Sequence, residues 1–162
     1  IISGRPTRRF AFEAFLPADK KERKEILETL EQETRTMILY EAPHRLLKTL
    51  GELYEVLGNR KISLCKELTK RYENVFNTTI EDAISYYEEN EPRGEFVLVI
   101  EGKTFAEIKK ESQEEFLTIS IGEHMERYLS QGMDKKQAMK QVAKDRGISK
   151  RDVYQALLDE EE

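Results

Sequence analysis

The stretch TMILYEAPHRLLKTL (residues 36–50) changes its hydrophobic pattern halfway along. Its first six residues form an apolar run typical of a buried strand, and in its second half leucines recur at the three- and four-residue spacing of a helix. Pro43 fits between the two, because the first turn of a helix leaves N–H groups without intrahelical partners. The stretch therefore predicts a strand followed directly by a helix, with Glu41, His44 and Arg45 at the junction.

Short apolar runs and amphipathic segments alternate on both sides of this stretch. We predict strands over residues 10–17, 36–41, 61–68 and 95–102, with an extended segment over 72–79. We predict helices over residues 19–34, 45–58 and 80–90. Interleaved strands and helices are typical of a layered domain. The fold class predicted for residues 1–102 is therefore α/β, a mixed sheet flanked by helices.

The composition changes after residue 102. Residues 103–116 are rich in lysine and glutamate with little hydrophobic periodicity, which predicts a linker. Residues 117–162 have helical patterns throughout, which predicts a small all-α helical extension. Within it, DKKQAMKQVAKDRGISKRDVYQALL (134–158) has the pattern of a helix–turn–helix hairpin, in which Gly147 permits the turn.

The charge of residues 134–158 differs in sign from that of the whole chain. This stretch carries seven lysines or arginines and three aspartates, a net charge of +4, whereas the whole chain has a net charge of −5. Such a local reversal favours a surface that faces phosphate groups. A solvated helical hairpin without a ligand explains the same residue types equally well.

The bulk properties restrict the class of protein. The 162 residues suffice for one ordinary domain with a small appendage, and the overall charge of −5 argues against a surface that binds nucleic acid everywhere. Cys65 has no partner for an internal disulfide, which favours a reducing cytoplasm. No apolar stretch approaches the roughly 20 residues that span a bilayer, so we expect no membrane partner. The opening IISGRPTRRF resembles the interior of a longer protein, which predicts a fragment.

Two predicted strands end in polar residues rather than in simple turns. The first end is YEAPHR (40–45) and the second is CKELTKRYE (65–73). Open α/β sheets bind ligands beyond the carboxyl ends of their strands, so both segments are candidate sites. A capping histidine and a solvated row of charges are the plainer alternatives. We predict no metal site, because His44 and His124 lie far apart in sequence and the cysteine is single.

Four blocks together resemble a known family. FAFEAFLP (10–17), TMILYEAPHRLLKTL (36–50), KELTKRYE (66–73) and GEFVLVIEG (94–102) have the order and spacing of the ribosomal RNA small subunit methyltransferase I family. Its members are bacterial 16S rRNA (cytidine-2′-O-)-methyltransferases of the tetrapyrrole (corrin/porphyrin) methylase superfamily. GISKRDVY (147–154) is similar to the helical extension that many members carry.

The resemblance implies a two-domain methylase with S-adenosylmethionine folded in the cleft between the domains. The glycine-rich motifs of the N-terminal domain are not found in this sequence. We therefore expect the C-terminal domain over residues 1–102, followed by the linker and the extension. Such a fragment would supply one wall of the cofactor cleft and would be inactive alone, while the full-length protein would be an enzyme.

The resemblance also implies site residues. The cofactor wall is expected to include Tyr40, Glu41, Ala42, Thr69 and Lys70. RNA contacts are expected from His44, Arg45, Lys144, Arg146, Lys150 and Arg151. His44 and Arg45 have the alternative of bracing the loop, as have Glu67 and Glu73 by pairing with lysine or arginine. No catalytic base is assigned, although Glu41 and His44 are of a suitable type.

The function implied is methylation of a cytidine ribose 2′-hydroxyl in 16S rRNA or the small ribosomal subunit by a cytoplasmic homodimer. One alternative is a methylase of a tetrapyrrole or another small molecule, which the basic extension disfavours. Another is a non-catalytic module for RNA binding or dimer formation.

Overall fold

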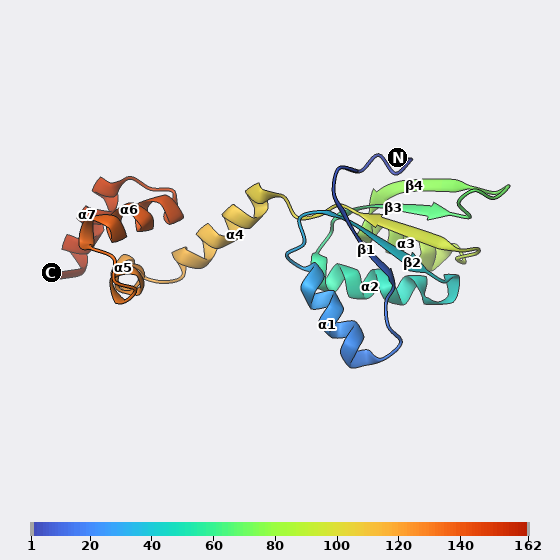
Figure 1. The fold of residues 1–162 in the computed structure, drawn as a ribbon, viewed down its shortest axis with the longest axis horizontal. Helices are drawn as coiled ribbons and strands as arrows, with labels where there is room; N and C mark the ends of the chain where they lie inside the picture. Colours follow the sequence, from blue (N-terminus) through green and yellow to red (C-terminus); the bar gives the residue numbers. More distant parts are fainter. Residues whose placement is uncertain (1, 162) are drawn as a thin grey trace. The chain divides into compact units, whose positions relative to one another are not determined.

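The chain forms two separate compact units. The computed structural model describes residues 2–161, and the chain divides between Thr104 and Phe105. We call the first part the α/β unit and the second the helical unit (Figure 1). Each unit has a hydrophobic core of its own.

A mixed sheet forms the centre of the α/β unit, as predicted. Within the described residues its strands are β1 (Phe10–Phe15), β2 (Thr36–Glu41), β3 (Lys61–Lys66), β4 (Asn74–Thr79) and β5 (Phe96–Ile100). Their order across the sheet is β1-β2-β5-β3-β4. The β1–β2 pair is parallel, and the other neighbouring pairs are antiparallel. Strands β1, β2 and β3 therefore all end at one end of the sheet, which we call the exit end.

Helices cover one face of this sheet. They are α1 (Lys20–Leu30), α2 (Leu46–Leu57) and α3 (Ile80–Glu89), and the short 3₁₀ helix η1 (Pro43–Arg45) precedes α2. Leucines of α1 and α2 pack with Met37, Leu39 and Leu98 of the sheet in a single core. The chain before β1 crosses the sheet (Figure 1), where Thr36 Oγ1 donates to Pro6 O at 2.8 Å. The helix-covered face thus holds the main apolar core.

The helical unit differs from the prediction at its start. It contains α4 (Phe105–Leu117), α5 (Ile121–Ser130), α6 (Lys135–Arg146) and α7 (Lys150–Glu161). The expected linker, residues 103–116, is thus mostly helix α4, which contacts α6. Glutamate, lysine and glutamine have good helix propensity, and α4 shows no apolar periodicity because none of its residues is fully buried. Gly147 ends α6 in the left-handed conformation, as the predicted turn requires.

Candidate functional site

The exit end brings the two polar segments to the same end of the sheet. Tyr40 to Ala42 lie where β2 ends, and Thr69 and Lys70 lie in the loop after β3. Only β5 separates β2 from β3, so the two strands run about 10 Å apart, twice the usual spacing. The sequence alone indicated each segment, and the sheet order makes them neighbours.

The Glu41 side chain points into the α/β unit. The residue is 2% exposed, and its carboxylate accepts a hydrogen bond of 2.5 Å from Thr49 Oγ1. The same carboxylate accepts from the Ala42 N–H at 2.8 Å and lies 3.6 Å from Arg45 Nε. Thr49 Oγ1 in turn accepts from Arg23 Nη2 at 2.7 Å. Glu41 therefore fixes the strand–helix junction from inside, which leaves only its backbone for the cofactor wall that the resemblance implies.

The other residues of the first segment have different surroundings. Tyr40 is 39% exposed. The centroid of its ring lies 5.2 Å from that of the Phe12 ring and 5.6 Å from that of the Phe15 ring. Arg45 Nη2 donates to Leu16 O at 2.9 Å, so this guanidinium braces the loop, one of its two predicted roles. His44 is exposed and forms no hydrogen bond or ion pair with any residue in the range 2–161.

The second segment is held in an unusual backbone conformation. Glu67 has φ 51° and Thr69 has φ 64°, both left-handed, which costs roughly 1 kcal/mol for each such residue. Glu67 Oε1 accepts from the Glu95 N–H at 2.8 Å, and Glu73 Oε2 accepts from the Thr69 N–H at 2.6 Å. Strained backbone that is over-determined by its contacts is frequent at ligand sites. The two glutamates thus hold the loop through backbone N–H groups. Within the described residues only Glu67 of the two also pairs with a lysine, Lys70, as the alternative prediction proposed for both.

Lys70 completes this loop. Its Nζ lies 2.8 Å from Glu95 Oε2 and 3.4 Å from Glu67 Oε1. The hydrogen bond to Glu95 is the main reason why the pKa of Lys70 is raised. The backbone N–H of Glu95 is the main reason why the pKa of Glu67 is lowered. Both groups therefore stay charged at neutral pH.

The predicted RNA-binding residues of the helical unit divide into two sets. Lys144, Lys150 and Arg151 are exposed. Arg146 points inward, and its Nη2 donates to Ile119 O and to Ser120 O, each at 2.7 Å. The guanidinium thus satisfies carbonyl groups before α5, and we assign it a structural role in place of the predicted phosphate contact.

His124 is buried behind Arg146. It is 1% exposed, stacks on Phe116 with ring centroids 4.2 Å apart, and accepts from Arg146 Nε through Nδ1 at 3.2 Å. Burial is the main cause that lowers the pKa of His124, and the charge of Arg146 lowers it further, while Asp145 opposes both. His124 is therefore a core residue of the helical unit.

Sequence reasoning missed a pocket at the exit end. An open pocket of about 540 Å³ lies between the β3–β4 loop and the C-terminal end of α3, with Tyr72, Tyr86 and Tyr87 among its lining residues. The available signal was the tyrosine pair at the end of the predicted helix 80–90 together with a lone tyrosine in a charged loop.

The described part of the chain shows neither a metal site nor a membrane-spanning helix. Among residues 2–161, no group of three or more histidines, cysteines, aspartates or glutamates could hold a metal ion. No helix in the same range has the length and apolar character needed to cross a membrane.

Comparison with known proteins identifies the family. The model for tetrapyrrole (corrin/porphyrin) methylases matches residues 3–84, about half of the chain. The chain belongs to the tetrapyrrole methylase family. This confirms the resemblance found in the sequence blocks, and the family match includes both segments at the exit end.

Relatives within this methylase family are similar over nearly the whole chain. Proteins named Ribosomal RNA small subunit methyltransferase I from Halalkalibacterium halodurans and Bacillus subtilis are each 44% identical over 156 residues, covering 95% and 96% of this chain. The protein of that name from Synechocystis is 40% identical over 160 residues, 98% of this chain. The chain spans about half the length of these relatives, 53% to 56%.

The exit end offers some of the groups that S-adenosylmethionine, the methyl donor implied by the family, would require. The Thr69 hydroxyl is exposed and makes no hydrogen bond with any residue from 2 to 161, so it can bind a hydroxyl or carboxylate of a ligand. Tyr40 presents a partly exposed ring. The Glu41 carboxylate is already occupied by Thr49 and Ala42. The residues present therefore fit one wall of a cofactor site.

Proposed function

We propose that this chain is the C-terminal part of an S-adenosylmethionine-dependent methyltransferase that acts on small-subunit rRNA. We further propose that the complete protein methylates a cytidine ribose 2′-hydroxyl and works as a homodimer. The main support is that relatives named for rRNA methylation match 95% to 98% of the chain, and so include both the α/β unit and the helical unit.

In this proposal the exit end supplies one wall of the donor site. S-adenosylmethionine supplies a methyl group made reactive by its sulfonium charge. The contribution of this chain is to position the donor with Tyr40, Ala42, Thr69 and Lys70 and to exclude water. Glu41 supports that wall from behind, because its carboxylate is bound to Thr49. That occupation argues against Glu41 as the base that accepts the hydroxyl proton.

The helical unit would then hold the RNA. Lys144, Lys150 and Arg151 are exposed and belong to the stretch with a net charge of +4. Phosphate contacts by lysine and arginine dominate RNA affinity and make it salt-dependent. This surface is the feature that favours RNA over a tetrapyrrole or another small molecule as the substrate.

A chimera tests the proposal. The N-terminal half of the Bacillus subtilis relative is joined to this chain and incubated with S-adenosylmethionine and small ribosomal subunits from a strain that lacks the relative. Mass spectrometry of digested rRNA is expected to find one new 2′-O-methylcytidine. A methyl group on a base, or methylation of a tetrapyrrole precursor but not of rRNA, would contradict the proposal.

Calorimetry of the 162-residue chain alone tests the division of the cofactor site. Weak or absent heat on addition of S-adenosylmethionine is expected, because one wall cannot enclose the donor. Tight binding would contradict the assignment of most cofactor contacts to another part of the protein. The non-catalytic alternative predicts that the chimera binds RNA but never methylates it.

A further inference from the structure

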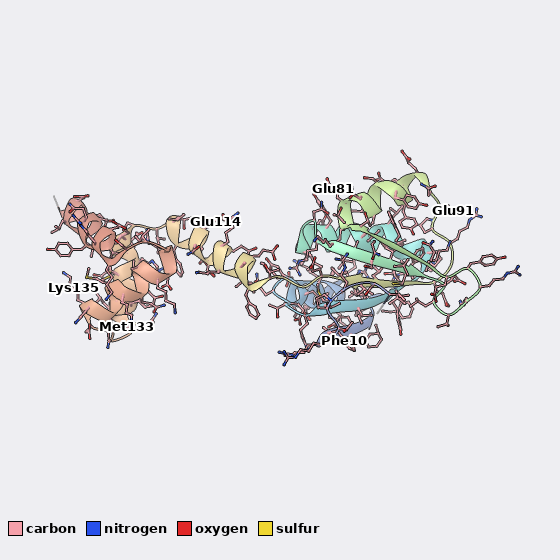
Figure 2. All side chains as sticks on the ribbon, turned by 90° about the horizontal axis from the view of Figure 1, so that it is seen from above. Phe10, Glu81, Glu91, Glu114, Met133 and Lys135 are labelled. Carbon is pink, nitrogen blue, oxygen red and sulfur yellow. The ribbon has the colours of Figure 1, made fainter. Side chains whose placement is uncertain are left out.

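The pocket beside the β3–β4 loop has no role in the function proposed so far. It lies at the exit end, where its walls include Tyr72, Tyr86 and Tyr87 and its rim includes Lys66, Asn90 and Arg93. Figure 2 shows Glu91, another lining residue, in the loop at this end of the α/β unit. The pocket shares the β3–β4 loop with Thr69 and Lys70, so a ligand bound in it would lie beside the proposed donor wall.

Two of the tyrosines are held in place yet remain accessible. Tyr86 is 47% exposed. The centroid of its ring lies 5.0 Å from that of the Phe76 ring and 5.0 Å from that of the Tyr87 ring. Tyr87 packs edge-on against the buried Phe96 at 5.6 Å. Tyr72 is 71% exposed on the opposite loop. The pocket thus presents aromatic rings fixed from one side, the arrangement on which an unstacked base can stack.

The rim adds polar and cationic groups. Lys66 forms no ion pair with any described residue. Arg71 does not line the pocket, but its guanidinium lies 5.7 Å from the centroid of the Tyr72 ring. Asn90 Nδ2 donates to Tyr86 O at 2.8 Å, which leaves the Asn90 side-chain oxygen as an acceptor. Arg93 is paired with Glu91 at 2.8 Å, so this carboxylate is neutralised at the rim. The aromatic rings, the Asn90 amide and the Lys66 ammonium together match the faces, edges and phosphates of single-stranded RNA.

We infer that this pocket binds one unstacked base of the RNA substrate, beside the nucleotide that is methylated. The inference rests on the proposed function, because it requires RNA as the substrate. A base bound here would fix the strand in register with the donor wall, while the helical unit contributes affinity through phosphates.

The absence of tryptophan from the sequence allows a direct test. Tyr86→Trp places a single tryptophan in the pocket, and Tyr54→Trp places one on α2, outside the pocket, where Tyr54 is 39% exposed. A single-stranded RNA of mixed sequence, about 12 nucleotides long and within the usual site sizes, is the probe. Stacking is expected to quench the Tyr86→Trp fluorescence saturably, and the Tyr54→Trp fluorescence is expected to stay unchanged.

Affinity supplies the second measurement. Fluorescence anisotropy of the labelled RNA is expected to show binding at least roughly fivefold weaker for Tyr86→Leu than for the unaltered chain, since stacking on one ring has that effect. Tyr54→Leu is the matched control and is expected to bind normally. Circular dichroism of both variants verifies that each remains folded. Lys66→Gln is expected to lower the slope of RNA affinity against salt concentration by the equivalent of about one phosphate contact. It leaves the aromatic rings of the pocket unchanged.

The outcomes separate the pocket from the proposed function. Normal RNA affinity for Tyr86→Leu, with no quenching of Tyr86→Trp, would refute base binding in the pocket. The proposal that rRNA is the substrate would be unaffected. Failure of the unaltered chain to bind RNA would overturn both. Quenching of Tyr86→Trp by S-adenosylmethionine alone would assign the pocket to the adenine of the donor and overturn the inference.

Discussion

Thr49 shows how one hydroxyl can connect two charged side chains. It is 1% exposed, donates to the Glu41 carboxylate and accepts from Arg23 Nη2. Arg23 is 4% exposed and also pairs with Glu52 at 2.6 Å. This role could not be predicted from the sequence, because a threonine inside a leucine-rich helix has the same local pattern whether it faces a charge or a methyl group.

Thr49→Val is expected to destabilise the α/β unit by about 1–3 kcal/mol, because it leaves a buried carboxylate and a buried guanidinium each short of a hydrogen bond. Urea unfolding followed by circular dichroism measures the change. Thr29→Val is the matched control, since Thr29 is exposed and donates only to Ile26 O in its own helix. Equal effects of the two substitutions would refute the role of Thr49.

Gly94 is a second residue whose environment fixes its identity. It has φ +83°, and a Cβ there would lie 2.6 Å from Glu67 Oε1. Gly94→Ala is expected to cost about 1–2 kcal/mol for the left-handed backbone, plus the displacement of Glu67 from the Glu95 N–H. Gly4→Ala is the control, because Gly4 has φ +67° but nothing within 4 Å of its Cβ position. In thermal unfolding, the midpoint temperature of Gly94→Ala should be clearly lower than that of Gly4→Ala. Equal midpoints would contradict the close approach of Glu67 to the Gly94 Cβ position.

His124 makes the stability of the helical unit depend on pH. Its pKa is lowered from 6.5 in the folded chain, mainly by burial, with Arg146 and Arg127 lowering it and Asp145 raising it. Below pH 6.5 the unfolded chain takes up a proton that the folded chain resists, so the free energy of unfolding falls as the pH decreases. Above that pH both states are neutral and the contribution is complete.

Urea midpoints at about pH 5.5 and about pH 7.5 measure this effect for the helical unit. The unaltered chain is expected to be less stable at the lower pH, and His124→Gln is expected to lose most of that difference. If the difference in urea midpoint between the two pH values persists in His124→Gln, another titrating group is responsible.

At the scale of elements, the exposed N-terminal turn of α7 is the part of the helical unit most suited to phosphate contacts. Lys150 and Arg151 are both exposed there. Replacing both with glutamate is expected to weaken RNA binding. The slope of the logarithm of the affinity against the logarithm of the salt concentration is expected to fall by the equivalent of up to about two phosphate contacts. The control exchanges Lys20 and Lys24 of α1 for glutamate, the same change of charge at two exposed positions of another helix. Equal salt slopes for the two double variants would reject the assignment.

Most elements could be predicted from hydrophobic period because that period is a local property. The strand–helix change within 36–50 and the turn at Gly147 are examples. Helix α4 could not, because it is rich in charged residues and none of its residues is fully buried. The site was predicted only in part. Its two loops follow from the strand ends. The inward direction of Glu41, however, depends on Thr49 in the following helix, and that of Arg146 depends on carbonyl groups 26 and 27 residues away.

At the scale of the whole molecule, the two units differ in what they offer a substrate. The α/β unit carries both segments at the exit end and the aromatic pocket, whereas the helical unit carries the locally reversed charge. Each unit has a core of its own, so we expect substitutions in one unit to leave the unfolding transition of the other unchanged, which urea unfolding followed separately in each unit would measure.

The central place of β5 also affects how the protein is made. β5 is the last strand of the α/β unit to be synthesised, yet both β2 and β3 pair with it. During translation, β1 to β4 leave the ribosomal tunnel before β5, which pairs with both β2 and β3. Until β5 emerges, Leu39 and Leu64 lack their strand partner Leu98 and are exposed to solvent and chaperones. Chaperone capture during translation should therefore peak before residue 100 emerges and decline once Phe96–Ile100 is free to insert.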